Sequence, residues 1–216
     1  MNNSVVNTGR LLWAGLRALL LLTVVCGVIY PLAVTGVAQA AFHGKANGSE
    51  ITSQGTVVGS SLIGQTYLTK DGKPDLTWFQ PRPSNGLGTN SINTRYKLIL
   101  SGATNLSGDN KELIKQVKDA KAAVVADNST ATYKVKAADI PADAVTSSAS
   151  GLDPQISPDY ADLQVHRVAE RNHLSVAQVH KLVDDHTDGR ILGFMGEPGV
   201  NVLELNSALR ELTAKG

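Results

Sequence analysis

Residues 18–42 read ALLLLTVVCGVIYPLAVTGVAQAAF, and this run contains no Asp, Glu, Lys or Arg. As an α-helix it would be about 37 Å long, because each residue adds about 1.5 Å along the axis. The hydrocarbon core of a bilayer is about 30 Å thick, so the run is long enough to cross it with some tilt. Residues 18–42 therefore predict a transmembrane helix.

A cleaved signal peptide is the alternative interpretation of this region. Arg10 and Arg17 precede the apolar run, and Ala38-Gln39-Ala40 has the A-x-A form of a cleavage site. The apolar core of a signal peptide is usually about 7–15 residues long, so the greater length here favours a retained anchor. By the positive-inside rule, the two arginines predict that residues 1–17 stay in the cytoplasm and that residues 43–216 form an extracytoplasmic soluble domain.

Three small or unusual residues inside the anchor are candidates for contact with a partner helix. Pro31 has no backbone N–H, so it is expected to kink the helix and to free a carbonyl that a neighbour could satisfy. Gly27 and Gly36 expose small surfaces that allow close helix packing. The sequence therefore predicts partner contacts at Gly27, Pro31 and Gly36.

The overall composition excludes several classes of function. The chain has 20 Lys and Arg residues against 19 Asp and Glu residues, and only 5% of its residues are aromatic. Binding to nucleic acid usually needs a basic surface or stacking aromatic groups, so we expect no nucleic-acid partner. The single cysteine, Cys26, allows neither an intramolecular disulfide nor a cysteine cluster for a metal. An external domain without disulfides is more typical of bacterial than of small animal secreted proteins.

The segment after the anchor contains several helix-start signals and fewer strand signals. The helix starts are at Asp109 or Asn110, at Ser157 before Pro158, at Ser175 with Gln178, and at Asn201 with Glu204. Strands are expected at residues 56–58, 132–135 and 191–194, and a further apolar stretch covers residues 98–100. The sequence therefore predicts the α+β class: one N-terminal transmembrane helix, then a single extracytoplasmic mixed α/β domain that is helix-rich in its second half.

Residues 59–66, GSSLIGQT, nearly match the phosphate-binding loop pattern G-x-x-x-x-G-K-[ST]. The lysine that would reach the phosphates is replaced by Gln65, and a neutral amide cannot supply that charge. The segment is also followed by turn-like residues rather than by a helix. We therefore expect a glycine-bounded turn here and not a nucleotide site.

Ser147, Ser148 and Ser150 form a second candidate site, for nucleophilic catalysis. They precede Gly151, but SASG does not match the G-x-S-x-G pattern that places a serine on a strained elbow. The spacing shows no base for a catalytic triad. A polar turn whose hydroxyls cap nearby backbone groups is the simpler interpretation.

His166, His173 and His180 are spaced by seven residues and are followed by Asp184-Asp185-His186. On one continuous helix this spacing would align the imidazoles. The helix start at Ser175 interrupts such a helix, so solvated helix faces are the favoured interpretation. The alternative function is a free-standing, membrane-anchored metal-binding or hydrolytic domain that uses these histidines.

Arg82 lies between Pro81 and Pro83, which fix the backbone on both sides of it. A guanidinium positioned in this way could form a bidentate pair with a carboxylate on another subunit, so Arg82 is a predicted partner contact. An internal ion pair is the equally open alternative.

Several motifs in order along the chain resemble the C subunit of the bacterial Kdp complex, a high-affinity potassium-transporting P-type ATPase. They are Tyr30-Pro31-Leu32, GSSLIGQ at residues 59–65, FQPRPS at 79–84, SGATNL at 101–106, AVTSSASGLD at 144–153, Gln164 with Arg167-Val168-Ala169, and GEP at 196–198 with VNVLELN at 200–206. The resemblance covers nearly the whole chain.

The resemblance implies a non-catalytic accessory subunit in the bacterial inner membrane. Its partners would be the ATP-hydrolysing pump subunit and the potassium-channel-like subunit, and these would handle ATP and potassium, so the chain would need no cofactor of its own. The family's C subunit is described as supporting assembly and as a catalytic chaperone that raises ATP affinity in the pump subunit. Gln164 matches the position that the family assigns to nucleotide contact.

The predicted orientation conflicts with a direct nucleotide contact at Gln164. The charge rule places this residue outside the cytoplasm, where ATP is scarce. Either the orientation differs from the prediction, or the effect on ATP binding is indirect. We favour an indirect effect, in which the subunit biases the conformation of its partners.

Overall fold

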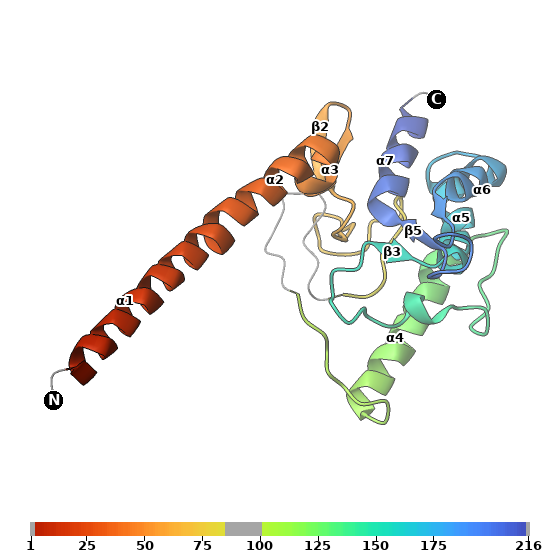
Figure 1. The fold of residues 1–216 in the computed structure, drawn as a ribbon. Helices are drawn as coiled ribbons and strands as arrows, with labels where there is room; N and C mark the ends of the chain where they lie inside the picture. Colours follow the sequence, from red (N-terminus) through yellow and green to blue (C-terminus); the bar gives the residue numbers. More distant parts are fainter. Residues whose placement is uncertain (1–2, 85–100, 215–216) are drawn as a thin grey trace. The chain divides into compact units, whose positions relative to one another are not determined.

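The computed structural model describes residues 3–84 and 101–214, and the chain divides into two compact units between Ser49 and Glu50 (Figure 1). The first unit is a long helix followed by a single helical turn. The second unit is a mixed helix and strand domain. One candidate transmembrane helix at the N-terminus followed by an α+β region confirms the predicted fold class.

The first unit consists of α1 (Asn3–Val24), the π-helical segment η1 (Val25–Ile29), α2 (Tyr30–Ala41) and the short α3 (His43–Ala46). Residues 4–41 form one continuous helical run of 38 residues that is long and apolar enough to cross a membrane. Such a helix is about 57 Å long and exceeds the bilayer core. The helix therefore continues through the positions of Arg10 and Arg17, beyond the apolar run that predicted it.

The π-helical segment lies immediately before the proline of the anchor. Tyr30 donates its backbone N–H to the carbonyl of Val25, five residues back. Pro31 occupies the first turn of α2, where its missing N–H is tolerated. Single π-turns of this kind commonly accommodate irregularities inside α-helices. The expected disturbance at Pro31 is therefore present as a wider helical turn.

The second unit begins with the hairpin of β1 (Glu50–Ser53) and β2 (Thr56–Ser60), which are antiparallel. Gln54 and Gly55 form its two-residue loop, with φ of 52° and 78°. Positive φ at both loop positions matches the twist of the flanking strands. The strand predicted at residues 56–58 is therefore confirmed as part of β2.

The predicted helix starts are confirmed by their caps. The Asn110, Ser157, Ser175 and Asn201 side chains each accept hydrogen bonds from backbone N–H groups in the first turn that follows. At Ser175 the reciprocal bond from the backbone to Gln178 is also present. The helices that these residues begin are α4 (Lys111–Asn128), α5 (Pro158–Arg171), α6 (Val176–Asp185) and α7 (Val202–Thr213), and a 3₁₀ turn, η2, spans Ala142–Ala144.

A small antiparallel sheet connects the helical half of the domain. Its order is β3 (Gln155–Ile156), β5 (Gly199–Asn201) and β4 (Thr187–Asp188). Every residue of the central strand β5 is buried. Helices α5, α6 and α7 share an apolar core with this sheet, and its largest fully buried apolar side chains are Tyr67, Phe79, Leu205, Leu209, Val165, Val168, Val179, Val183, Val200 and Val202.

Two predicted strands are wrong. Residues 132–135 are irregular, because Thr130 donates its N–H to the Tyr133 carbonyl and Val135 donates to the Ser129 hydroxyl. Residues 191–194 belong to a tight turn closed by a single bridge between Ile191 and Met195. In both segments β-branched and aromatic residues favour a strand, but no strand in the described part of the chain pairs with them. The apolar stretch at residues 98–100 lies outside the described residues.

Candidate functional site

Residues 76–80 lie against the core, with the Phe79 side chain fully buried, and they pair with no described strand. Gln164 of α5 takes the place of a neighbouring strand at one end of this segment. The Gln80 N–H donates to Gln164 Oε1 at 2.7 Å, and Gln164 Nε2 donates to the Gln80 carbonyl at 3.1 Å. One buried amide side chain therefore satisfies both backbone polar groups of Gln80.

Asn206 of α7 makes the same pair of bonds to the preceding residue. The Phe79 N–H donates to Asn206 Oδ1 at 2.9 Å, and Asn206 Nδ2 donates to the Phe79 carbonyl at 2.9 Å. Asn172, at the end of α5, adds a 2.8 Å bond from Nδ2 to the Thr77 carbonyl. Side chains from two helices thus replace the hydrogen bonds that a strand would otherwise supply.

Arg167 connects these bonds into one network. Its Nη2 donates to Gln164 Oε1 at 2.6 Å, and its Nη1 donates to the carbonyls of Trp78 and Leu76. Its Nε donates to Asn128 Oδ1 of α4 at 2.9 Å. Burial lowers the pKa of Arg167 to about 10, so the guanidinium is still charged at neutral pH. The network therefore joins α4, α5 and residues 76–80 through one buried cation.

Gln164 has no exposed surface, and both of its polar atoms form hydrogen bonds within the domain. A ligand could contact this side chain only after the bonds to Gln80 and Arg167 were broken. An unpaired buried amide costs about 1–3 kcal/mol for each group left without a partner. The geometry therefore favours a positioning role for Gln164.

Arg82 forms an internal ion pair, which is one of the two predicted alternatives. Its Nη1 lies 3.0 Å from Asp153 Oδ2, and its guanidinium also donates to the carbonyls of Thr146 and Ser147 at 3.3–3.4 Å. These contacts tie the segment before residue 85 to the AVTSSASGLD motif. The Arg82 side chain is 21% exposed, and its contact with a partner subunit stays a prediction.

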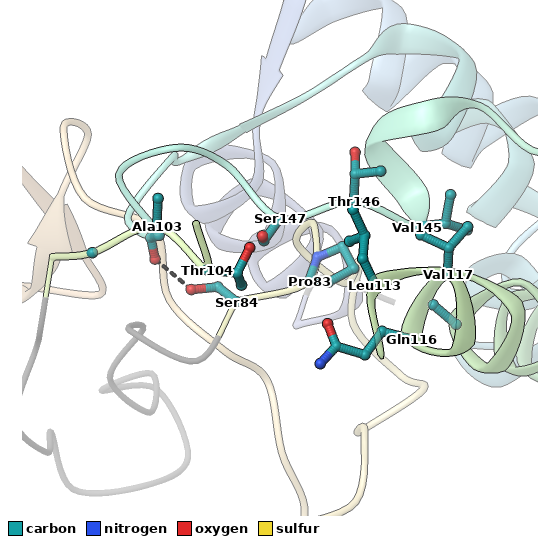
Figure 2. Close-up of a pocket in the computed structure, with 13 residues that line it drawn as sticks. Pro83, Ser84, Ala103, Thr104, Leu113, Gln116, Val117, Val145, Thr146 and Ser147 are labelled. Carbon is teal, nitrogen blue, oxygen red and sulfur yellow. Dashed lines mark hydrogen bonds between the residues drawn. The ribbon is translucent and has the colours of Figure 1, made fainter. Parts of the chain in front are cut away.

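A cavity of about 380 Å³ is lined in part by Thr146 and Ser147, whose carbonyls accept hydrogen bonds from Arg82, and by Pro83 (Figure 2). Leu113 and Val117 of α4 face Val145 on its apolar side, and the hydroxyls of Ser84 and Ser147 lie toward its other end. Residues 85–100, which follow Ser84 in the chain, lie outside the described residues. No ligand is assigned to this cavity.

Two of the three histidines, His166 and His180, line one cavity together with Asp159 and Asp162, and His173 is not among its lining residues. His166 stacks on Tyr133 with ring centroids 4.0 Å apart. His173 adopts a φ of 57° just after the end of α5. His180 pairs with Asp184 at 3.1 Å and lies 3.7 Å from Asp162. Within residues 3–84 and 101–214, no group of three or more His, Cys, Asp or Glu side chains could hold a metal ion.

The GSSLIGQT segment at residues 59–66 forms a turn, and a hydrogen bond from the Gln65 side chain stabilises it. Gln65 Nε2 donates to the Val58 carbonyl at 2.8 Å, and a Cβ on Gly59 would lie 2.2 Å from that nitrogen. Gly59 therefore leaves room for the Gln65 amide, and the interpretation as a glycine-bounded turn agrees with the structure. Similarly, Ser150 accepts a hydrogen bond from the Leu152 N–H, as expected of a polar turn.

Sequence reasoning missed Asn206, Asn172 and Gln80 as members of the buried network. The available signal was a polar residue at a core-facing helical position. Asn206 lies between Leu205 and Leu209 in the apolar stripe of α7, and Gln164 lies between Leu163 and Val168 in that of α5. Buried polar side chains require partners, so such positions indicate a specific internal network.

Comparison with known proteins covers both units of the chain. The family model described as "K+-transporting ATPase, c chain" matches residues 12–211. A potassium-transporting ATPase KdpC subunit from Streptomyces avermitilis is 74% identical over 99% of both chains. Proteins of the same name from Streptomyces coelicolor and Kineococcus radiotolerans are 66% and 43% identical, each over at least 97% of both chains.

Proposed function

Since the chain belongs to the KdpC family, the c chain of K+-transporting ATPases, we propose that it is the accessory subunit that supports assembly of such an ATPase and raises the ATP affinity of its pump subunit. The observation that carries this proposal is the match across both the anchor and the domain. The pump subunit and the potassium-channel-like subunit would be its partners, and they would handle ATP and potassium.

The internal contacts of the candidate residues support a non-catalytic role. Gln164, Arg82 and Gln65 are the residues that sequence patterns associate with nucleotide or partner chemistry, and each forms hydrogen bonds within the domain. A catalytic group must instead be able to reach a substrate. In this proposal these residues shape the domain, and the reaction takes place on the partners.

We further propose that the anchor lies in the bacterial inner membrane with its N-terminus in the cytoplasm and residues 43–216 outside. Arg10 and Arg17 support this orientation by the positive-inside rule. Gly27, Pro31 and Gly36 would face a partner helix. Within the described part of the chain, a Cβ on either glycine would meet no atom within 4 Å, so a neighbouring helix could approach closely there.

An indirect effect on ATP affinity follows from this arrangement. The subunit would stabilise one conformation of the partner helices, and that conformation would bind ATP more tightly. Coupling between distant sites is typically about 1–3 kcal/mol, which changes affinity by about 5–150-fold. Gln164 would contribute by holding residues 76–80 in place through its bonds to Gln80.

The test of this function is reconstitution. The chain is expected to co-purify with the pump and channel-like subunits in mild detergent, and the complex containing it should have a lower KM for ATP than the complex without it. If the other subunits assemble and hydrolyse ATP with the same KM in its absence, the proposed function is wrong.

A second measurement separates a direct from an indirect nucleotide effect. Hydrogen exchange of α5 in the purified full chain is expected to be unchanged by micromolar ATP, because Gln164 is buried and hydrogen-bonded. Protection of the amides around Gln164 by ATP would refute the indirect account and would leave the accessory role intact.

A further inference from the structure

Residues 191–195, ILGFM, form a small apolar hairpin between β4 and β5. The exposed fractions of its four large side chains are 68% for Ile191, 80% for Leu192, 70% for Phe194 and 50% for Met195. Single exposed apolar side chains are common, but four of them on one five-residue turn are not. We refer to residues 191–195 as the apolar tip.

The apolar tip has a defined backbone. Ile191 and Met195 exchange two hydrogen bonds, with N–H to carbonyl distances of 2.9 and 3.0 Å, and Gly193 donates to the Arg190 carbonyl at 3.0 Å. An ion pair of 2.7 Å between Arg190 and Glu197 closes its base. The four side chains are therefore presented on a preformed turn, which lowers the entropy lost on binding.

Leu192 is unfavourable at its position in two independent ways. Its φ of 54° lies in the left-handed region, which bulky residues rarely adopt and which favours glycine or asparagine. Its side chain is also the most exposed of the four. Neither the backbone nor the solvent favours leucine here, and local strain of this kind is concentrated at binding sites.

We propose that the apolar tip docks into an apolar pocket on another protein subunit of the ATPase complex. This inference rests on the proposed function, because it requires such a complex. Four apolar side chains around one rigid turn have the form of an interface anchor, which gains its binding energy by filling a pocket on the partner.

The charges beside the apolar tip favour a protein partner over a lipid surface. Residues 184–197 contain four acidic residues, and Arg190 is the one Lys or Arg among them. Asp184, Asp185 and Glu197 are paired with His180, Lys181 and Arg190, and Asp188 forms no ion pair in the described contacts. Loops and helices that insert into membrane surfaces usually combine apolar groups with Lys and Arg, which attract anionic lipids. Asp188 and the net negative charge of residues 184–197 instead predict a basic residue beside the partner's pocket.

The test uses the full chain co-expressed with the other subunits. Leu192→Asn removes the apolar side chain and suits the left-handed backbone, so its thermal stability should equal or exceed that of the wild type. Its retention in the complex upon dilution should nevertheless be about tenfold weaker. Phe194→Ser should weaken retention similarly. Ile114→Gln, at an exposed apolar position on α4, is the matched control and should be retained normally.

The outcomes separate the two proposals. If the wild-type chain does not co-purify with the other subunits, the proposed function fails. If the wild type co-purifies and Leu192→Asn and Phe194→Ser are retained equally well, only the docking role of the apolar tip fails. A photoreactive benzoylphenylalanine in place of Phe194 identifies the contact: cross-links to another subunit support the proposal, and cross-links only to lipid or to a second copy of this chain overturn it.

Discussion

Gln164 is the residue at which the family resemblance and the structure can be compared most directly. The resemblance assigns it to nucleotide contact, and in the structure its amide replaces a strand partner for Gln80 and accepts from Arg167. These contacts explain why an amide is needed at this position: it donates and accepts at once. A purely acceptor side chain would leave the Gln80 carbonyl unsatisfied, and an apolar side chain would leave both the N–H and the carbonyl unsatisfied.

The first prediction concerns this amide. Gln164→Ala removes the partners of the half-buried N–H and carbonyl of Gln80 and one acceptor of the buried Arg167, so the free energy of unfolding should fall by about 2–4 kcal/mol. Gln116→Ala is the control, because Gln116 bonds only to the exposed Glu112 in the described contacts of α4; it should cost about 0.5 kcal/mol or less. Denaturant unfolding of the full chain in detergent measures both. Equal losses of unfolding free energy in the two variants would contradict a stabilising role of the bonds between Gln164 and Gln80.

The second prediction concerns Asp127. Burial raises the pKa of its carboxyl, and Arg167 partly offsets this. The carboxylate also lies in the last turn of α4, where a negative charge opposes the helix dipole. A raised native pKa means that the folded state binds the proton more tightly than the unfolded state, so the charged form of Asp127 lowers stability at pH 7 and this penalty disappears as the pH falls through its native pKa.

Asp127→Asn should therefore raise the melting temperature at pH 7, and the difference from wild type should shrink on acidification toward pH 4. Thermal unfolding of both proteins across this range measures the effect. Asp119→Asn is the control at an exposed position of the same helix, where the carboxylate pairs with Lys115; it should not stabilise the protein. A stability gain for Asp127→Asn that is constant with pH would contradict titration of this carboxyl as the cause.

At the scale of elements, the helices could be predicted and most of the strands could not. A helix start depends on a few neighbouring residues, and the Ser157 and Ser175 caps are visible in the sequence. β3 and β4 contain two residues each and exist only because β5 lies between them. The sequence pattern of so short a strand carries no information about a partner more than ten residues away, which is why residues 132–135 and 191–194 were assigned wrongly.

The same limit applies to the candidate site. Arg82 was recognised because two prolines flank it, but its partner, Asp153, lies 71 residues away and could not be identified from local pattern. The side chains that hold residues 76–80 come from two helices, and their convergence depends on tertiary packing. A residue whose role depends on its sequence neighbours could be predicted. A site built from side chains of several distant segments could not.

The π-helical segment of the anchor yields the third prediction. Pro31→Ala restores a backbone N–H, which should allow residues 25–29 to return to α-helical bonding. This change rotates Gly27 relative to Gly36, so the two small surfaces would no longer face one partner helix. Retention of the chain in the purified complex on dilution in mild detergent measures the contact, and it should be weaker for Pro31→Ala than for the wild type. Leu21→Ala, outside the segment, should leave retention unchanged.

At the scale of the whole molecule, the deciding property is which side of the membrane the domain occupies. The apolar run of residues 18–42 separates Arg10 and Arg17 from the domain, and the charge rule predicts that the domain lies outside the cytoplasm. The proposed orientation would keep the buried amide of Gln164 away from cytoplasmic ATP, and the proposal of an indirect nucleotide effect depends on it.

The last prediction therefore tests orientation. Protease added to spheroplasts should cut the domain, where the Lys70–Pro74 loop is exposed, whereas protease added to inverted vesicles should leave it intact until detergent is added. Replacing both Arg10 and Arg17 by Glu should lower the fraction of chains with the domain outside. Cleavage in inverted vesicles alone would place the domain beside ATP, and the interpretation of Gln164 would then turn on whether binding of the nucleotide can open the bonds from its amide to Gln80 and Arg167.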